Sequence, residues 1–103
     1  MVRRKGRKIS TPFFNLFYVR RNGELAEPSR FGFVVSTKLD KRAVKRNRVK
    51  RVFREAIRPL LPEIKDGFDF VFWVRRRSLE MKSDRMQAVI ETVLKKSGLL
   101  VND

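Results

Sequence analysis

Apolar residues in this chain gather in short runs that alternate with polar ones, and the pattern predicts four strands. Residues 13–20 are rich in aromatic and β-branched types, as strands are, and residues 31–36 are a second apolar run of strand length. Residues 8–10 are a candidate for a short strand. Residues 68–74 (FDFVFWV) are almost wholly apolar, which predicts a strand covered on both faces. Between the second and third strands, the pair Asn22-Gly23 predicts a tight turn.

Two other segments have helical spacing. In residues 41–58 (KRAVKRNRVKRVFREAIR) apolar residues recur every three to four positions, which predicts a helix that ends near Pro59 or Pro62. A second helix is predicted from about Ser83 to Ser97, with Ser83 as its N-cap and Gly98 ending it. Its apolar stripe, which faces the core, is Met86, Val89, Ile90, Val93 and Leu94.

The order of these elements predicts an α+β fold with a small mixed or antiparallel sheet of about four strands, packed with helices. No repeat or linker divides the 103 residues, so residues 1–103 are expected to form one domain. Alternation in residues 13–20 places Asn15 and Phe17 on one face and Phe14 and Leu16 on the other. One face belongs to the core. The other is either a binding surface or a face covered by a helix.

Charge narrows the class of partner. The chain has 26 Lys and Arg against 11 Asp and Glu, a formal charge of +15, which favours a polyanion as the partner of the protein. Nucleic acid is the commonest such partner, and an anionic membrane surface is the alternative. No segment has the apolar length needed to span a bilayer. The run 13–19 is interrupted by Asn15 and followed by Arg20-Arg21, so we interpret it as a strand rather than a signal peptide.

The helix predicted at 41–58 separates its apolar and basic residues. One arc, which faces the sheet, carries Val49, Val52, Phe53, Ala56, Ile57 and Leu60. The opposite arc carries Arg46, Asn47, Arg48, Lys50, Arg51, Arg54 and Arg58. A merely solvated face would mix charges of both signs, yet Glu55 is the only acid here, so the arc favours phosphate binding. Asn47 fits either a contact to a base or ribose, or an N-terminal helix cap.

The kind of nucleic acid follows from what accompanies this helix. The sequence has no helix-turn-helix partner, zinc ligands or heptads of a DNA-binding motif. Aromatic strands allow stacking on unpaired bases, which favours RNA.

The chain offers little for catalysis. It has no His and no Cys, the usual general base and the usual metal ligands. The carboxylates of Asp40, Glu55, Asp66 and Asp69 are dispersed, so we predict no catalytic residue and no metal site on the protein. A protein-only nuclease is therefore disfavoured.

The segment 31–58 (FGFVVSTKLDKRAVKRNRVKRVFREAIR) closely resembles the bacterial ribonuclease P protein subunit, whose signature is an Arg-Asn-Arg helix after a strand ending in Ser or Ala and Lys. The likeness extends through residues 67–77 into the final helix and back to residues 6–22. It implies a left-handed β-α-β crossover through this helix. It also implies a cytoplasmic protein, monomeric in the holoenzyme, that assists removal of the 5′ leader from precursor tRNA. The RNA subunit would carry the catalysis, with Mg²⁺ held by RNA and substrate.

The resemblance also assigns residues. Those implied to bind the RNA subunit are Lys38, Lys41, Arg42, Arg46, Asn47, Arg48, Lys50, Arg51 and Arg54. Asn15 and Phe17 match positions in the cleft for the single-stranded leader. Family members usually have a further helix, a wall of that cleft, before the first strand, and MVRRKGRKIS is expected to lack it. The alternative function is a stand-alone RNA-binding protein of ribosomal type.

Overall fold

A computed structural model of the chain describes residues 6–21 and 27–101. Four strands form one sheet in the order β1-β2-β4-β3. Their bounds are β1 Arg7–Ser10, β2 Phe14–Arg20, β3 Arg30–Val34 and β4 Phe68–Val74. β2 pairs antiparallel with β1 and β4, and β3 pairs parallel with β4. The predicted α+β class is confirmed, and of the two sheet types left open by the sequence the observed sheet is mixed. The turn predicted at Asn22-Gly23 lies outside the described residues.

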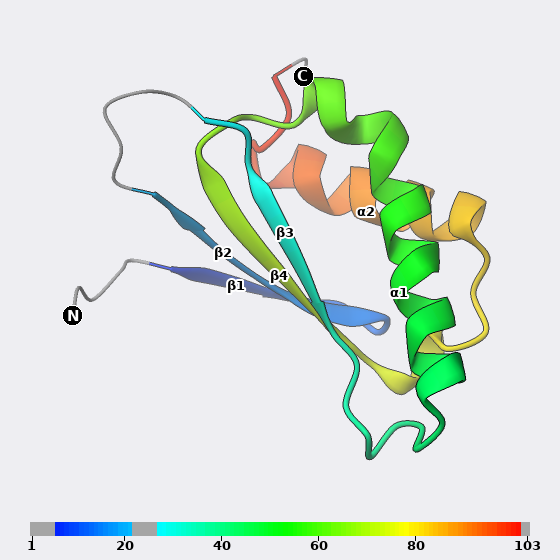
Figure 1. Ribbon diagram of the computed structural model, residues 1–103. Helices are drawn as coiled ribbons and strands as arrows, with labels where there is room; N and C mark the ends of the chain where they lie inside the picture. The colour runs from blue at the N-terminus through cyan, green and yellow to red at the C-terminus, as the bar shows by residue number, and fades with distance from the viewer. Residues whose placement is uncertain (1–5, 22–26, 102–103) are drawn as a thin grey trace.

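Both long helices lie on the same side of this sheet (Figure 1). They are α1 (Ala43–Ile57) and α2 (Ser83–Lys96), and two short 3-10 helices, η1 (Arg58–Glu63) and η2 (Arg76–Ser78), follow α1 and β4. The core lies between the layers, where Phe14 and Phe72 of the sheet meet Phe53 of α1. The Phe14 ring meets Phe53 and Phe72 edge-on, with centroids 5.9 and 5.1 Å apart. All three rings are fully buried.

The basic segment folds as its pattern predicts. Val49, Phe53, Ala56 and Ile57 are buried against the sheet and α2. The α-helix ends at Ile57 because proline at position 59 lacks an N–H and changes the chain to a 3-10 turn. α1 connects β3 to its parallel neighbour β4, and this is the crossover that the resemblance concerns. Its left-handedness stays a prediction.

Two local predictions were wrong. Ser83 is the first residue of α2, not its cap; Lys82 holds the N-cap position, and no side chain caps this end. Gly98, with φ +72°, does end the helical region as predicted. The second error concerns β4, which is covered on one face only. Phe70, Phe72 and Val74 are buried, whereas the Trp73 side chain is 47% exposed, because both helices lie on the opposite side of the sheet.

Candidate nucleic-acid interface

α1 and the segment before it present the predicted cations together. Because its apolar residues face the sheet, α1 turns Asn47, Arg48, Arg51 and Arg54 to solvent, all exposed, while Arg46 and Lys50 are half-buried. Lys38, Lys41 and Arg42 are exposed in the segment that leads from β3 into the helix. We call this set the α1 cationic surface: Lys38, Lys41, Arg42, Arg46, Asn47, Arg48, Lys50, Arg51 and Arg54.

Most of the α1 cationic surface has no internal counter-charge. Among the described residues, Arg48, Lys50, Arg51 and Arg54 form no ion pair with a carboxylate. Arg42 is the exception: its Nε and Nη2 donate to the two carboxylate oxygens of Asp40, both at 3.1 Å. These hydrogen bonds hold the pKa of Asp40 below its ordinary value. The cations without partners therefore remain available to an external anion.

Arg46 has a second task within the protein. Its Nη1 donates to the backbone carbonyls of Asp40 and Lys41, at 3.0 and 2.9 Å. No side chain caps the N-terminus of α1, so these bonds tie the preceding loop to the helix. A guanidinium has five N–H donors, so the remaining donors of Arg46 can still meet a phosphate. Asn47 is the fifth residue of α1, which excludes the reading of this residue as an N-cap.

Arg54 is oriented by an aromatic ring. Its guanidinium carbon lies 5.7 Å from the centroid of the Phe33 ring, within cation–π range. Phe33 in turn packs against Phe53 and Phe72 in the core. The sheet thus helps to fix the direction in which α1 presents this cation.

A second surface lies on the side of the sheet away from the helices. We call it the open sheet face: Lys8, Asn15, Phe17, Val71 and Trp73, which the strand register places in adjacent rows. Phe17 is 39% exposed and meets Trp73 edge-on, with centroids 6.3 Å apart. The Lys8 ammonium stands 5.6 Å from the centroid of the Phe17 ring. Exposed rings beside a cation are what an unpaired nucleotide binds.

Asn15 on this face has a buried atom that lacks a partner. Its Oδ1 is buried and accepts no hydrogen bond from any described residue. A buried acceptor left unpaired costs about 1–3 kcal/mol, so a change of the Asn15 rotamer that brings this oxygen to a donor is favoured.

The family model described as Ribonuclease P matches residues 1–98. The chain belongs to the ribonuclease P protein family. A ribonuclease P protein component of Xanthomonas campestris pv. campestris is 39% identical over 94 residues, which are 91% of this chain and 60% of that protein. The chain thus spans about 60% of the length of these curated relatives.

Solved structures of the ribonuclease P protein family share the fold. The RNase P protein of Staphylococcus aureus superposes with a TM-score of 0.75 at 29% identity, covering 92% of this chain and 84% of that one. The RNase P protein of Thermotoga maritima gives a TM-score of 0.76 at 25% identity, covering 89% and 84%.

Two residues of the open sheet face were missed by sequence reasoning in this ribonuclease P protein. Trp73 was placed in a strand covered on both sides, and Lys8 was given no role. The signal for Trp73 was present, because Phe70, Phe72 and Val74 alternate with it and fill the core. The position of Lys8 beside Phe17 follows only from the strand register, which pairs the two residues.

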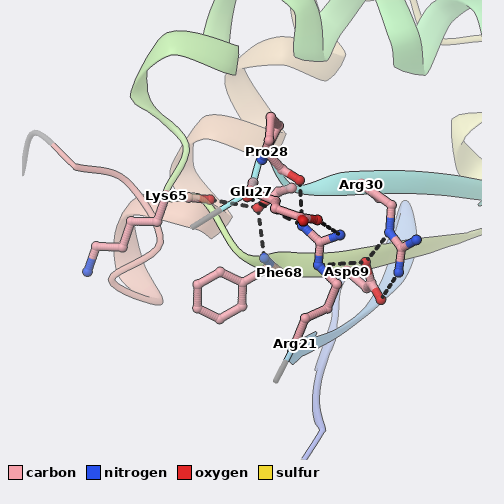
Figure 2. Close-up of polar contacts among 8 residues, drawn as sticks. Arg21, Glu27, Pro28, Arg30, Lys65, Phe68 and Asp69 are labelled. Carbon is pink, nitrogen blue, oxygen red and sulfur yellow. Dashed lines mark hydrogen bonds and ion pairs between the residues drawn. The ribbon is translucent and has the colours of Figure 1, made fainter. Parts of the chain in front are cut away.

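Ion pairs lie at one end of the open sheet face. Figure 2 shows Asp69 between two arginines. Arg30 donates to both carboxylate oxygens of Asp69, from Nε at 2.8 Å and Nη2 at 2.9 Å. Arg21 Nε lies 3.6 Å from Oδ1 of the same carboxylate. The bonds from Arg30 hold the pKa of Asp69 below its ordinary value. These contacts join β2, β3 and β4 at one end of the sheet.

Two further findings concern metals and membranes. Within residues 6–21 and 27–101, no three His, Cys, Asp or Glu side chains are grouped closely enough to hold a metal ion. No helix in the same ranges has the length and apolar character needed to cross a bilayer.

Proposed function

We propose that this chain is the protein subunit of ribonuclease P, which binds the catalytic RNA and assists removal of the 5′ leader from precursor tRNA in the cytoplasm. The observation that carries the proposal is the α1 cationic surface. Its exposed Arg48, Arg51 and Arg54 have no carboxylate partner among the described residues. Membership of the ribonuclease P protein family supports this choice of RNA partner and substrate.

The α1 cationic surface would hold the RNA subunit by its phosphates. Arginine forks bind phosphate oxygens in pairs, and a rigid helix presents them at fixed spacing. Each phosphate neutralised releases counterions, so the affinity falls with salt. One copy of the protein on one RNA is sufficient for this arrangement.

The open sheet face would hold the single-stranded leader. A base that stacks on Phe17 or Trp73 gains contact with a half-exposed ring, and the Lys8 ammonium beside it meets the adjoining phosphate. Once its side chain turns toward the leader, the unpaired Oδ1 of Asn15 can accept a hydrogen bond from a base amino group or a ribose hydroxyl.

The protein would assist the reaction by electrostatics. Catalysis would reside in the RNA subunit, with Mg²⁺ held by RNA and substrate. A protein of charge +15 reduces the repulsion between two polyanions, so less Mg²⁺ is needed to bring them together.

The test is cleavage of precursor tRNA by a bacterial ribonuclease P RNA, with and without this protein, over a series of Mg²⁺ concentrations. The protein should lower the Mg²⁺ concentration that gives half-maximal cleavage. The Arg48→Ala/Arg51→Ala variant should lower this concentration less than the wild type does. The Lys82→Ala/Arg85→Ala variant, which loses equal charge at the start of α2, should behave as the wild type. Equal cleavage at low Mg²⁺ with and without protein would refute the proposal and favour a stand-alone RNA-binding protein.

A further inference from the structure

A cavity lined by aromatic and basic residues lies on the helix side of the sheet, away from the open sheet face. Its volume is about 530 Å³, and it lies between the ends of β1 and β2, the loop before β4, and the end of α2. We call it the α2-end pocket, defined by Arg7, Tyr18, Arg20, Lys65, Phe68 and Gly98.

The pocket exists because α2 ends before it covers the last part of the sheet face. Strand register places Arg7 opposite Tyr18, and Arg20 opposite Phe68. These side chains share the face of the sheet on which Leu16 and Phe70 are buried beneath the helices. α2 stops at Lys96, and Gly98 turns the chain with φ +72°, so this part of the face receives no helix.

Three cations in the α2-end pocket have no ion-pair partner among residues 6–21 and 27–101. Arg7, Arg20 and Lys65 are exposed and form no ion pair with any described carboxylate. Asp66 also lines the cavity, so the charged side chains there sum to 3 − 1 = +2. In Figure 2 the Lys65 ammonium points away from the network around Asp69. Three unpaired cations around one cavity favour an anion, and two arginines favour phosphate.

The end of α2 does not cancel this preference. Carbonyls of a last helical turn repel anions when they lack partners. Here the N–H groups of Ser97, Gly98 and Leu99 already bond the carbonyls of Val93, Lys95 and Leu94, at 2.9–3.1 Å.

The wall of the pocket is aromatic. The Tyr18 and Phe68 rings are half-buried, with centroids 6.2 Å apart, and both stand beside the buried Phe70 ring. The Tyr18 hydroxyl makes no hydrogen bond within the described residues. A planar base can therefore lie against a ring and bond this hydroxyl.

We infer that the α2-end pocket binds an unpaired nucleotide of RNA, with its phosphate on Arg7, Arg20 and Lys65 and its base against Tyr18 and Phe68. This site is separate from both surfaces described above. That the nucleotide comes from RNA rests on the proposed function, whereas the preference for a phosphate beside an aromatic base rests on the pocket itself.

The test measures binding of a fluorescein-labelled tetrauridylate by anisotropy. The background is the Phe17→Ala/Trp73→Ala variant, in which the open sheet face has lost its rings. Arg7→Glu/Arg20→Glu should weaken the remaining binding about tenfold or more, and Phe68→Leu about fivefold or more. The matched control is Lys82→Glu/Arg85→Glu, which changes the charge equally at the other end of α2 and should weaken binding less than about twofold.

Three outcomes would overturn the inference. Equal weakening by both charge-reversed pairs would mean that only the overall charge matters. Competition by inorganic phosphate as strong as that by uridine monophosphate would mean that the aromatic wall contributes nothing. An unchanged affinity in Arg7→Glu/Arg20→Glu would mean that the pocket is empty in solution.

Two controls separate folding and the proposed function from this result. Circular dichroism and thermal melting check each variant, and if Arg7→Glu/Arg20→Glu melts early, Arg7→Gln/Arg20→Gln takes its place. The pocket variants should still lower the Mg²⁺ requirement of ribonuclease P RNA at saturating protein. If they do and tetrauridylate binding is intact, the pocket inference alone fails. If wild-type protein does not lower the requirement, the proposed function fails.

Discussion

At the scale of single residues, the arginines of the α1 cationic surface differ in ways that their spacing does not reveal. Arg48 and Arg51 are exposed and have no carboxylate partner among the described residues. Arg46 is half-buried and bonded to two backbone carbonyls. The same substitution should therefore have different consequences at these positions.

Arg48→Ala and Arg51→Ala should weaken binding to ribonuclease P RNA without changing the melting temperature. Each should reduce the slope of log K against log salt by roughly 0.7–0.9, the value for one lost phosphate contact. Arg46→Ala should weaken binding and also lower the free energy of unfolding by about 1 kcal/mol, because two hydrogen bonds to the loop are lost. Titrations at several salt concentrations and urea unfolding measure the two effects. Equal stability losses at all three positions would contradict this division.

Trp73 is the only tryptophan of the chain, so its fluorescence reports on the open sheet face. A single-stranded leader oligonucleotide should quench it, because a base would stack on or beside the indole. Phe17→Ala should weaken the interaction about fivefold or more, since stacking on an aromatic ring contributes roughly 1–3 kcal/mol per base. A duplex of the same sequence is the control and should quench far less. Fluorescence that stays constant at saturating oligonucleotide would exclude a leader on this face.

At the scale of elements, the residues just after β2 and at the start of β3 are held by ion pairs and hydrogen bonds to the start of β4 and the loop before it. Asp69 binds Arg30 and Arg21 (Figure 2). Ser29 Oγ donates to the Lys65 carbonyl at 2.7 Å and accepts from the Phe68 N–H at 3.0 Å. These contacts couple three strands through side chains rather than through sheet hydrogen bonds alone.

The Asp69 ion pairs should make stability depend on pH. Because the pKa of Asp69 is lowered in the folded protein, its contribution is fully present above the ordinary carboxyl pKa of about 3.9 and is lost as the pH falls through the lowered pKa. Asp69→Asn should therefore destabilise the protein at pH 7 and hardly at all near pH 2. Urea unfolding of both proteins across this range measures the difference. A stability loss independent of pH would mean that the ion pairs contribute nothing.

α1 depends on its buried arc rather than on its basic one. Phe53 is fully buried, so Phe53→Ala should lower the free energy of unfolding by about 3–5 kcal/mol. Val44 lies in the same helix and is 78% exposed, so Val44→Ala should change it by less than about 0.5 kcal/mol. Guanidinium unfolding compares the two, and a large effect of Val44→Ala would show that α1 packs differently.

At the scale of the whole molecule, a sheet with both helices on one side separates the two candidate surfaces (Figure 1). The α1 cationic surface is carried by the helical layer and the segment that leads into it, and the open sheet face lies on the other side of the sheet. The two surfaces share no residue, so each can hold a different RNA segment in the proposed complex.

Substitutions on the two surfaces should therefore act independently. Arg48→Ala/Arg51→Ala should weaken binding to the RNA subunit. Phe17→Ala/Trp73→Ala should weaken binding of leader-bearing tRNA relative to leaderless tRNA. In the combined variant the losses in binding free energy should add within about 0.5 kcal/mol. The measurement is equilibrium binding of leader-bearing tRNA to holoenzyme assembled with the wild type, with each double variant and with the combined variant. A coupling well above that value would mean that the two surfaces bind one continuous RNA segment.

The sequence alone determined the four strands, the two long helices, and the apolar arc and uncompensated cations of α1, because these depend on spacing within one segment. The Arg-Asn-Arg helix and the strand before it also carried the family resemblance without any coordinates. The sequence did not determine which face of β4 stays open, since the apolar run at 68–74 is compatible with cover on both sides.

Only the tertiary structure decided which distant residues share a site. Lys8 meets Phe17 through strand register, Arg46 meets two carbonyls because the loop before α1 folds back, and Arg7 lies with Lys65 because α2 ends where it does. Each of these contacts depends on the packing of segments far apart in the chain or on the path of a loop. Local periodicity carries no information about either.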